Sequence, residues 1–380
     1  MKFIINGAKL HSAMQSISGV ISTNNAIPIV ENFLLTLEDN SIEITGCDLE
    51  TMATVKIELD SYEAGDVNKV LVPAKLLDEL VSSLSSMPLN IKVNDDTLAV
   101  EISAGEGKYT IAGLSADNYP KMMEVEDPQT MTLPSTIIVN AISKTSFATG
   151  TDELRPQMTG IYCEQMPDGI TFVATDAHKL VRYRCEECKS DEEVKFILPK
   201  KPLTLVSKIL SSFNEELEVN TNFNYNNVSF TFANYKIVSR LIEGKYPNYD
   251  AAIPKNNPNK LIIDRQMFLS SVKRAAILTN KSTQQIHLKL TENQLIVSAD
   301  DIDYENKAEE PLNCSYDGEE MEIGFNAKYL QEMLNNIDTI NILFEMSQPN
   351  RAGIIHPYDE TAEANLEDIL MLIMPVTLMN

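Results

Sequence analysis

Apolar and polar residues follow one pattern that is found three times along the chain. A short apolar strand leads, through a proline or asparagine, into a helix with apolar residues at helical spacing on one face. The three junction residues are Pro73, Pro199 and Asn326, which are 126 and 127 residues apart. A fixed period indicates one structural unit used repeatedly. Because this period is a third of the chain, we expect the repeated unit to be a domain.

The rest of the pattern predicts two helices and several short strands in each unit. The helices are predicted at 7–18, 73–86, 134–148, 200–213, 264–281 and 325–336. Two other landmarks keep nearly the same period, namely the hairpin turns at Asp48, Asp176 and Asp300 and the closing prolines Pro120, Pro247 and Pro375. The sequence therefore predicts an α+β fold of three repeated domains, 1–125, 126–253 and 254–380, each with two helices packed on antiparallel sheets.

Composition narrows the class of protein. The chain has no run of 18 apolar residues, and its first residues become polar too soon for a signal peptide, so we expect a cytoplasmic protein without a membrane span. Its five cysteines are scattered, which favours reduced thiols over a disulfide framework. Cys185 and Cys188 form a CxxC pair, but no second pair completes a zinc site. We therefore expect no metal and no cofactor.

Charge is distributed unevenly between the helices and the remainder. The whole chain carries a net charge of −24, yet the six predicted helices contain 11 basic and four acidic residues. Solvated helix faces are one explanation. The alternative that we favour is a positive surface built from all six helices, which would attract phosphate without reading sequence.

Six local motifs, spread over the whole length, carry a family resemblance. They are Thr45-Gly46-Cys47-Asp48-Leu49-Glu50, Ala174-Thr175-Asp176-Ala177-His178-Lys179-Leu180, Gly244-Lys245-Tyr246-Pro247-Asn248-Tyr249, Arg274-Ala275-Ala276-Ile277-Leu278, Met321-Glu322-Ile323-Gly324-Phe325-Asn326 and Met374-Pro375. With them the chain resembles the beta subunit of bacterial DNA polymerase III, the sliding clamp. The resemblance implies a non-catalytic, head-to-tail homodimeric ring that encircles duplex DNA at the nucleoid and tethers the replicative polymerase.

The resemblance also implies three sets of site residues. The DNA-facing set is Lys9, Lys75, Lys144, Lys201, Lys208, Lys273, Arg274 and Lys328. The dimer interface is expected at Tyr109 and Ile111 of one subunit and at Ile277 and Leu278 of the other. A pocket for peptides of polymerases, the clamp loader and other clamp-binding proteins is expected at Met158, Thr175, Ala177, His178, Lys179, Leu180, Pro247, Thr283, Asn326, Tyr329, Ile373, Met374, Pro375, Val376 and Leu378. The chain departs from the family pattern at Ala177, Ala251, Thr283 and its extended tail.

The residues alone also leave three other functions possible. A phage- or plasmid-encoded clamp paralogue would carry the same motifs. A hydrolase could use Asp176 and His178, since an Asp–His pair can orient a general base, although no nucleophile motif accompanies them. A protein-only scaffold with solvated basic helices is the third possibility.

Overall fold

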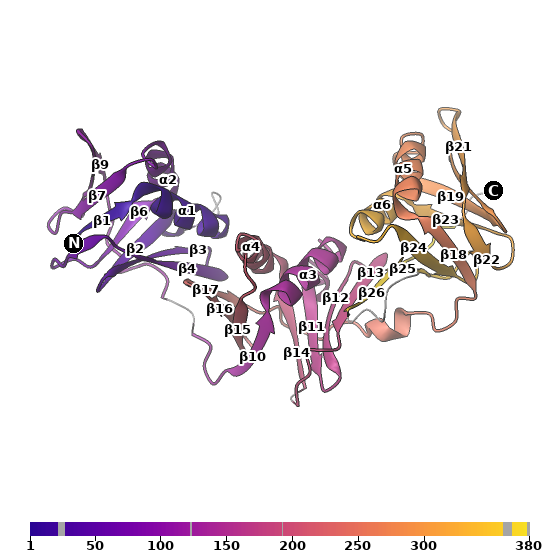
Figure 1. Ribbon diagram of the computed structural model, residues 1–380, viewed down its shortest axis with the longest axis horizontal. Coiled ribbons are helices and arrows are strands. Elements are labelled where there is room, and N and C mark those ends of the chain that lie inside the picture. The colour runs from indigo at the N-terminus through magenta and orange to yellow at the C-terminus, as the bar shows by residue number, and fades with distance from the viewer. Residues whose placement is uncertain (22–26, 122–123, 192, 360–366, 378–380) are drawn as a thin grey trace. The chain divides into compact units, whose positions relative to one another are not determined.

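The computed structural model describes residues 1–21, 27–121, 124–191, 193–359 and 367–377 (Figure 1). Its α-helices are α1 Gly7–Ile17, α2 Ala74–Ser83, α3 Ser135–Thr145, α4 Lys200–Leu210, α5 Arg265–Ala276 and α6 Ala327–Asn335. Short 3-10 helices are η1 Ser18–Val20, η2 Pro28–Glu31, η3 Ser146–Ala148, η4 Pro156–Met158 and η5 Tyr249–Ala252. The six helices expected from the apolar pattern are thus confirmed, with ends that differ by a few residues.

The order of strands and helices is repeated in each third of the chain. The first third contains β1 Lys2–Asn6, β2 Asn32–Glu38, β3 Ser41–Cys47, β4 Thr51–Glu58, β5 Ser61–Glu63, β6 Lys69–Pro73, β7 Pro88–Val93, β8 Val100–Ala104 and β9 Gly107–Ile111. The second contains β10 Gln129–Pro134, β11 Gly160–Met166, β12 Gly169–Thr175, β13 Lys179–Cys185, β14 Val194–Pro199, β15 Glu218–Phe223, β16 Asn227–Phe232 and β17 Tyr235–Arg240. The last contains β18 Asn259–Asp264, β19 Gln285–Thr291, β20 Gln294–Asp301, β21 Asn306–Asn313, β22 Ser315–Asp317, β23 Met321–Asn326, β24 Asn341–Met346, β25 Gly353–Tyr358 and β26 Glu367–Ile373.

Local sequence explains where the helices begin. Asn6, Asp264 and Asn326 are N-caps, and their side-chain oxygens accept hydrogen bonds from backbone N–H groups two or three residues further on. Such caps satisfy donors that have no partner within the helix. The apolar stripe of α1, from Leu10 to Ile17, is buried, as its helical spacing predicts. Among the described residues, no helix is long and apolar enough to cross a membrane.

The described chain divides into two compact units, which are treated separately. Unit 1 comprises residues 1–139 and 201–241. It contains a five-stranded sheet in the order β5-β1-β7-β8-β9 and an eight-stranded sheet in the order β10-β15-β16-β17-β4-β3-β2-β6. In the larger sheet β4 pairs with β17 in antiparallel fashion, from Thr51 opposite Ser239 to Val55 opposite Tyr235. Strands of the first and second thirds of the chain therefore share one sheet.

Unit 2 comprises residues 140–200 and 242–380. Its larger sheet has nine strands in the order β14-β11-β12-β13-β26-β25-β24-β18-β22, and its smaller sheet has four in the order β21-β20-β19-β23. Here β13 pairs with β26 in antiparallel fashion, from Lys179 opposite Ile373 to Cys185 opposite Glu367. This pairing joins the second and last thirds of the chain in the same way.

We call the β4–β17 pairing the first joint and the β13–β26 pairing the second joint. By order in the repeat, β21 corresponds to β4 and β13, while β9 corresponds to β17 and β26. In the described part of the chain, β21 and β9 each have a neighbouring strand on one side only. The strands that would form a third joint, β21 and β9, are therefore each at the edge of a sheet and not paired with each other.

Two sequence landmarks do not repeat as expected. Residues 48–51, 176–179 and 302–305 connect the paired hairpin strands, so Ile302 is the counterpart of Asp48 and Asp176. Asp300 instead lies within β20, opposite Lys307. This part of the periodicity was coincidental, because a carboxylate in a strand and one in a turn cannot be told apart by spacing.

The closing prolines are also only partly equivalent. Tyr119 and Tyr246, which precede Pro120 and Pro247, donate corresponding hydrogen bonds to the carbonyl oxygens of Thr45 and Val173. In the last third, however, it is Val376 that bonds to the strand before α6, as Leu114 and Ile242 do before α2 and α4. Pro375 therefore precedes this point, whereas Pro120 and Pro247 follow it.

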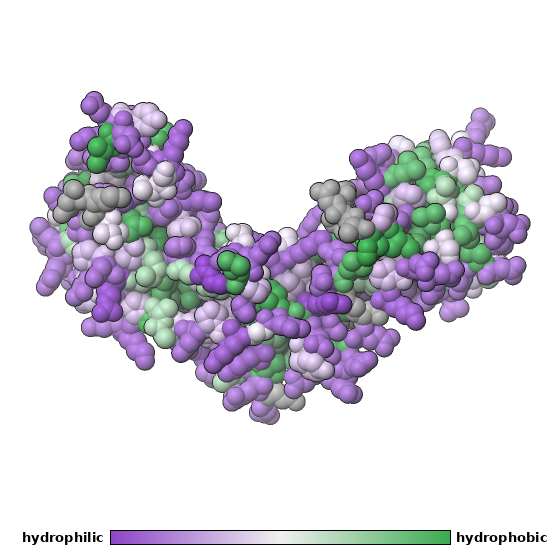
Figure 2. All heavy atoms as spheres, turned by 180° about the vertical axis from the view of Figure 1, so that it is seen from behind, coloured by the Kyte–Doolittle hydropathy of each residue, from purple (hydrophilic) through white to green (hydrophobic). Residues whose placement is uncertain are grey.

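The surface is largely polar. Hydrophilic residues cover most of the face drawn in Figure 2, and hydrophobic residues are visible between them. The large apolar side chains that are exposed in the described residues include Leu76, Tyr109, Leu114, Ile277, Ile302 and Tyr304.

Candidate binding site at the second joint

A hairpin turn between β12 and β13 begins the candidate site. The backbone N–H groups of His178 and Lys179 both donate to Oδ1 of Asp176, at 2.9 Å. Thr175 Oγ1 donates to the carbonyl oxygen of Lys179 at 2.7 Å. Ala177 has a φ of +75°, in the left-handed region. Glycine adopts this region without strain, whereas the Cβ of Ala177 makes it costly.

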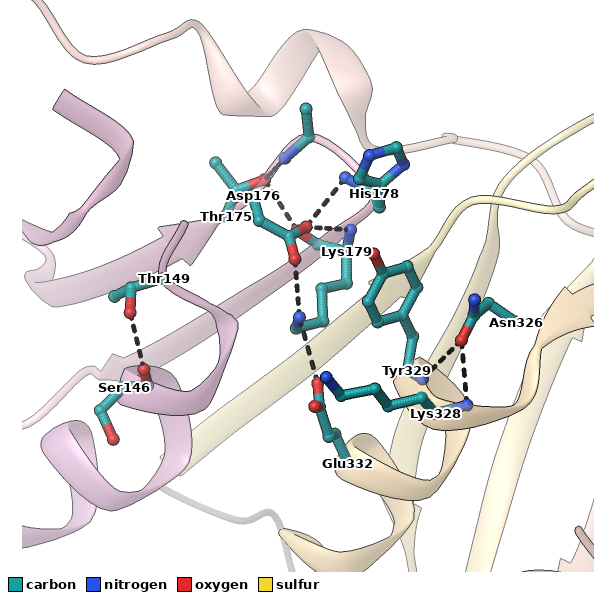
Figure 3. Close-up of polar contacts among 11 residues, drawn as sticks. Ser146, Thr149, Thr175, Asp176, His178, Lys179, Asn326, Lys328, Tyr329 and Glu332 are labelled. Carbon is teal, nitrogen blue, oxygen red and sulfur yellow. Dashed lines mark hydrogen bonds and ion pairs between the residues drawn. The ribbon is translucent and has the colours of Figure 1, made fainter. Parts of the chain in front are cut away.

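The ammonium group of Lys179 lies at the centre of a charged cluster. Its nitrogen is 2.6 Å from Asp176 Oδ2 and 3.1 Å from Glu332 Oε2, and it lies 4.5 Å from the centre of the Tyr329 ring (Figure 3). The side chain is only 5% exposed. Burial acts to lower the pKa of Lys179, but the hydrogen bonds and charges of Asp176 and Glu332 outweigh it and raise that pKa. We call Asp176, Lys179, Tyr329 and Glu332 the Lys179 cluster.

Tyr329 also contacts the ring of His178. The two rings are stacked with centres 5.8 Å apart and planes 19° apart. Tyr329 lies in the first turn of α6, where the Asn326 side chain accepts a hydrogen bond from its N–H and donates one to the Thr283 carbonyl oxygen at 3.3 Å. Figure 3 shows the Tyr329 ring and the Lys179 side chain between the turn and α6, with the His178 ring at the turn itself.

The chain's tail completes this region. Met374 N–H donates to the His178 carbonyl oxygen at 2.9 Å, and Val376 N–H donates to the Gly324 carbonyl oxygen at 2.9 Å. The Met374 residue is 41% exposed. Beneath the turn is an apolar cluster of buried residues from both thirds of the chain, namely Val173, Leu180, Ile197, Tyr246, Ala352, Ile354, Leu370 and Leu372.

The structure brings most of the predicted peptide residues together. Thr175, Ala177, His178, Lys179, Thr283, Asn326, Tyr329, Ile373, Met374 and Val376 are connected by the contacts above, and Leu180 and Tyr246 place Pro247 beside the same cluster. Met158 is connected indirectly, because its carbonyl oxygen accepts a hydrogen bond from the N–H of Gly150 at 2.7 Å and Gly150 lies against Asp176. Pro375 lies between Met374 and Val376, and Leu378 lies outside the described residues. Glu332 was missed, although its helical spacing of three from Tyr329 places both on one face of α6.

The first joint has the same backbone but different side chains. Arg240 N–H donates to the Glu50 carbonyl oxygen at 3.0 Å, as Met374 N–H does to His178 at the second joint. The side chains of Arg240 and Glu50 form an ion pair at 3.8 Å. An exposed thioether and an aromatic stack thus stand at the second joint where the first has opposite charges. Apolar groups with a few polar ones are typical of ligand sites.

The arrangement of Asp176 and His178 does not match that of a catalytic pair. Asp176 accepts hydrogen bonds from two backbone N–H groups and from the Lys179 ammonium. The imidazole of His178 lies instead against Tyr329. Asp176 therefore stabilises the turn and orients Lys179. In addition, no group of three or more metal-ligating side chains occurs in the part of the chain that the structure describes.

The predicted DNA-facing residues fall into two groups. Lys9, Lys75, Lys208, Lys273 and Lys328 are exposed, and no ion pair involves them among the described residues. Lys144 pairs with Asp338, Lys201 with Asp48 and Arg274 with Glu310. Lys144 and Lys201 also donate to the carbonyl oxygens of Asn336 and Val20, both at 3.0 Å. These three cations have carboxylate partners within the chain, which reduces their attraction for phosphate.

Comparison with known proteins gives one consistent result. Models of the N-terminal, central and C-terminal domains of the DNA polymerase III beta subunit match residues 1–123, 132–248 and 250–375. The chain is 27% identical to the beta sliding clamp of Pseudomonas aeruginosa, over 100% of both chains, and 27% identical to that of Bacillus subtilis, over 99% of both.

Solved structures agree with this result. The DnaN sliding clamp of Pseudomonas aeruginosa bound to griselimycin is similar with a TM-score of 0.92 at 26% identity, over 100% of both chains. The DNA polymerase sliding clamp of Bacillus subtilis gives a TM-score of 0.90 at 25% identity, again over 100% of both chains.

Proposed function

The chain belongs to the DNA polymerase III beta subunit family and is a DNA sliding clamp, and we propose that it works as a head-to-tail homodimeric ring around duplex DNA. The observation that carries this proposal is the open third pair of joining strands, β21 and β9. Pairing β21 of one chain with β9 of a second chain, twice, would repeat the two internal joints and leave neither edge exposed. Exposed strand edges are a liability that closure removes.

The internal joints also predict the register of this pairing. Ser239 and Ile373 lie opposite Thr51 and Lys179. Each is three residues before the residue, Ile242 or Val376, that bonds to the strand leading into the second helix of its own repeat. The same rule sets Ile111 opposite the partner's Glu305. Tyr109 then lies opposite Lys307 of the partner subunit, and Lys108 lies opposite the partner's Ala308.

Exposed apolar residues support the same contact. Leu76 has in α2 the position that Tyr329 has in α6, because both follow an Ala-Lys pair at the helix start. Tyr304 occupies, in the turn between β20 and β21, the position that His178 occupies in the turn between β12 and β13. These side chains are 50% and 76% exposed, respectively, and Ile277 is 79% exposed. In the proposed dimer Leu76 of one chain would meet Tyr304 of the other, as Tyr329 meets His178 at the second joint, and exposed apolar surface of this kind is typical of protein interfaces.

The helices supply the charge that such a ring needs. Within their observed bounds, the six α-helices contain ten basic and three acidic residues, although the whole chain has a net charge of −24. We propose that Lys9, Lys75, Lys208, Lys273 and Lys328 contact the DNA backbone most directly, with Lys144, Lys201 and Arg274 contributing less. Contacts to phosphate carry no sequence information, which suits a ring that slides.

The candidate site at the second joint would receive the partners. We propose that peptides of the replicative polymerase, the clamp loader and other clamp-binding proteins bind against His178, Tyr329, Met374 and Val376. Domain limits at about 125 and 253 follow from the repeat. In this proposal the protein acts in the cytoplasm at the nucleoid and catalyses no reaction itself.

Two measurements test the ring. Sedimentation of the purified chain should give the mass of a dimer. A clamp loaded onto nicked circular DNA should stay bound in high salt and be released once the circle is linearised. A monomer at micromolar concentration, or equal retention on linear and circular DNA, would contradict the proposal.

A further inference from the structure

Cys185 and Cys188 lie close enough to react with each other. Cys185 is the last residue of β13, Cys188 lies in the turn that follows, and their Sγ atoms are 3.4 Å apart. Cys185 is 1% exposed, whereas Cys188 is half-buried and reachable from solvent. A short rotation of either side chain would bring the two sulfur atoms to bonding distance.

The turn that carries Cys188 is held in place from below. The buried side-chain amide of Gln165 donates to the carbonyl oxygen of Cys188 at 2.8 Å and to that of Gly169 at 3.3 Å. Cys185 is fixed by strand pairing with Ile170. Because both segments are anchored to the same hairpin, the two thiols remain neighbours.

Other roles for this pair find less support. The described residues offer no group of three metal-ligating side chains, and a structural zinc site needs four ligands. The remaining cysteines are less suited to reaction. Burial raises the pKa of Cys47, Cys163 and Cys314, which disfavours the reactive thiolate.

We propose that Cys185 and Cys188 form a redox-active dithiol that is oxidised reversibly to a disulfide by a small-molecule disulfide. The Cys188 thiolate attacks the oxidant, whose S–S bond breaks, and one small thiolate leaves. Cys185 then loses its proton to solvent and attacks Cys188 Sγ, and the second small thiolate leaves. Two protein thiols are oxidised, and one small disulfide is reduced to two thiols.

Exposure assigns the two roles. Cys188 is the residue that an oxidant can reach, and the buried Cys185 resolves the mixed disulfide. Glu186 and Glu187, both exposed, lie between the two cysteines. The Glu186 carboxylate lies 3.9 Å from the Arg184 guanidinium, and the exposed Lys189 follows Cys188. Charges of both signs therefore surround the pair, and either a cationic or an anionic disulfide can serve as the oxidant.

The experiment uses the full-length chain, treated with glutathione disulfide or with cystamine and then analysed by intact mass and thiol titration. The wild-type protein should become lighter by two hydrogen atoms, lose two titratable thiols, and recover both with dithiothreitol. Digestion should place the cross-link between residues 185 and 188. Cys185→Ala should instead accumulate a stable adduct on Cys188, and Cys188→Ser should remain unmodified at Cys185.

Three outcomes would overturn the proposal. They are a stable mixed adduct on the wild-type chain, loss of two hydrogens that persists in Cys185→Ala, and no reaction while a small free thiol in the same solution is oxidised. Circular dichroism of both variants shows whether they fold. If Cys185→Ala fails to fold, the digestion map of the wild-type protein decides the proposal. Sedimentation tests the ring separately from these thiol measurements, so a negative result for the dithiol leaves the ring proposal unchanged.

Discussion

The ammonium nitrogen of Lys179 lies 3.1 Å from Oε2 of Glu332 and thereby ties a hairpin turn in the second third of the chain to a helix in the last third. The same ammonium bonds to Asp176 at 2.6 Å within its own turn. With 5% of its side chain exposed, Lys179 offers little surface to a partner. In the proposed site it would position the turn against α6, and His178, Tyr329 and Met374 would meet the peptide.

Replacing Lys179 with methionine should weaken both the fold and the binding of a clamp-binding peptide. The change leaves the Asp176 and Glu332 carboxylates without their cation. Because these side chains are 16% and 30% exposed, the cost should be below the roughly 3–5 kcal/mol of a fully buried pair. We expect a lower Tm and a loss of peptide affinity of at least about tenfold by calorimetry, which corresponds to about 1.4 kcal/mol. Lys179→Arg should retain most of the affinity. The positioning role would be wrong if Lys179→Met bound peptide like the wild-type chain.

The tail should be required for peptide binding but not for dimer formation. Deletion of residues 374–380 removes the Met374 and Val376 hydrogen bonds and an exposed thioether. Fully burying such a side chain contributes roughly 1.5–3 kcal/mol, so Met374→Ala should weaken binding by about tenfold. Calorimetry measures the affinity, and sedimentation serves as the control for the dimer. Unchanged affinity in both variants would exclude the tail from the site.

Charges introduced beside β21 should separate the subunits. Ile277→Asp with Leu278→Asp places two carboxylates where apolar contact is expected, and sedimentation should then give monomers.

A cross-linking experiment tests the register of the same pairing. Tyr109→Cys combined with Lys307→Cys should cross-link two chains under mild oxidation, since residues directly opposite in an antiparallel pair have Cβ atoms about 4.5–5.5 Å apart. Tyr109→Cys with Pro311→Cys, four residues out of register, is the matched control. Equal cross-linking of both pairs would contradict the register.

DNA binding should depend on the lysines that have no carboxylate partner among the described residues. Neutralising Lys9, Lys75, Lys208 and Lys273 to glutamine should weaken low-salt binding and reduce the salt slope by about one for each phosphate that is no longer neutralised. The same change at Lys144 and Lys201 should have a smaller effect on the slope, because these residues already pair with Asp338 and Asp48. Fluorescence anisotropy over a salt series provides the measurement. A change in sequence preference would argue against a sliding mode.

Ala177→Gly should stabilise the turn of the candidate site. The φ of +75° is strained for alanine, and a left-handed conformation costs roughly 1–2 kcal/mol in residues with a Cβ. Part of this gain is offset by the greater freedom of glycine in the unfolded chain. We expect a small rise in Tm in thermal unfolding. Leu49→Gly, with a φ of +78° in the corresponding first turn, is the matched comparison. A fall in Tm for both variants would show that the turn is not strained.

The amino-acid sequence by itself determined the repeat, the helices and the family. Periodic apolar residues and caps such as Asn6 and Asp264 are local signals, so the six helices could be predicted within a few residues. The turn at residues 174–180 could be recognised from the sequence, and with it part of the candidate site, because its characteristic residues are consecutive in the chain. Spacing alone was less reliable, since Asp300 and Pro375 kept the period without sharing the structural position.

Only the tertiary structure decided which strands share a sheet and which charges are compensated. The β4–β17 and β13–β26 pairings connect residues far apart in sequence, and nothing local distinguishes their edges from those of β9 and β21. Glu332 contacts Lys179 in the candidate site, and Lys201 forms an ion pair with Asp48, because backbone pairing brings distant segments within a few ångströms of each other. Sequence patterns report local preference, whereas ion pairs and sheet edges depend on how the elements pack.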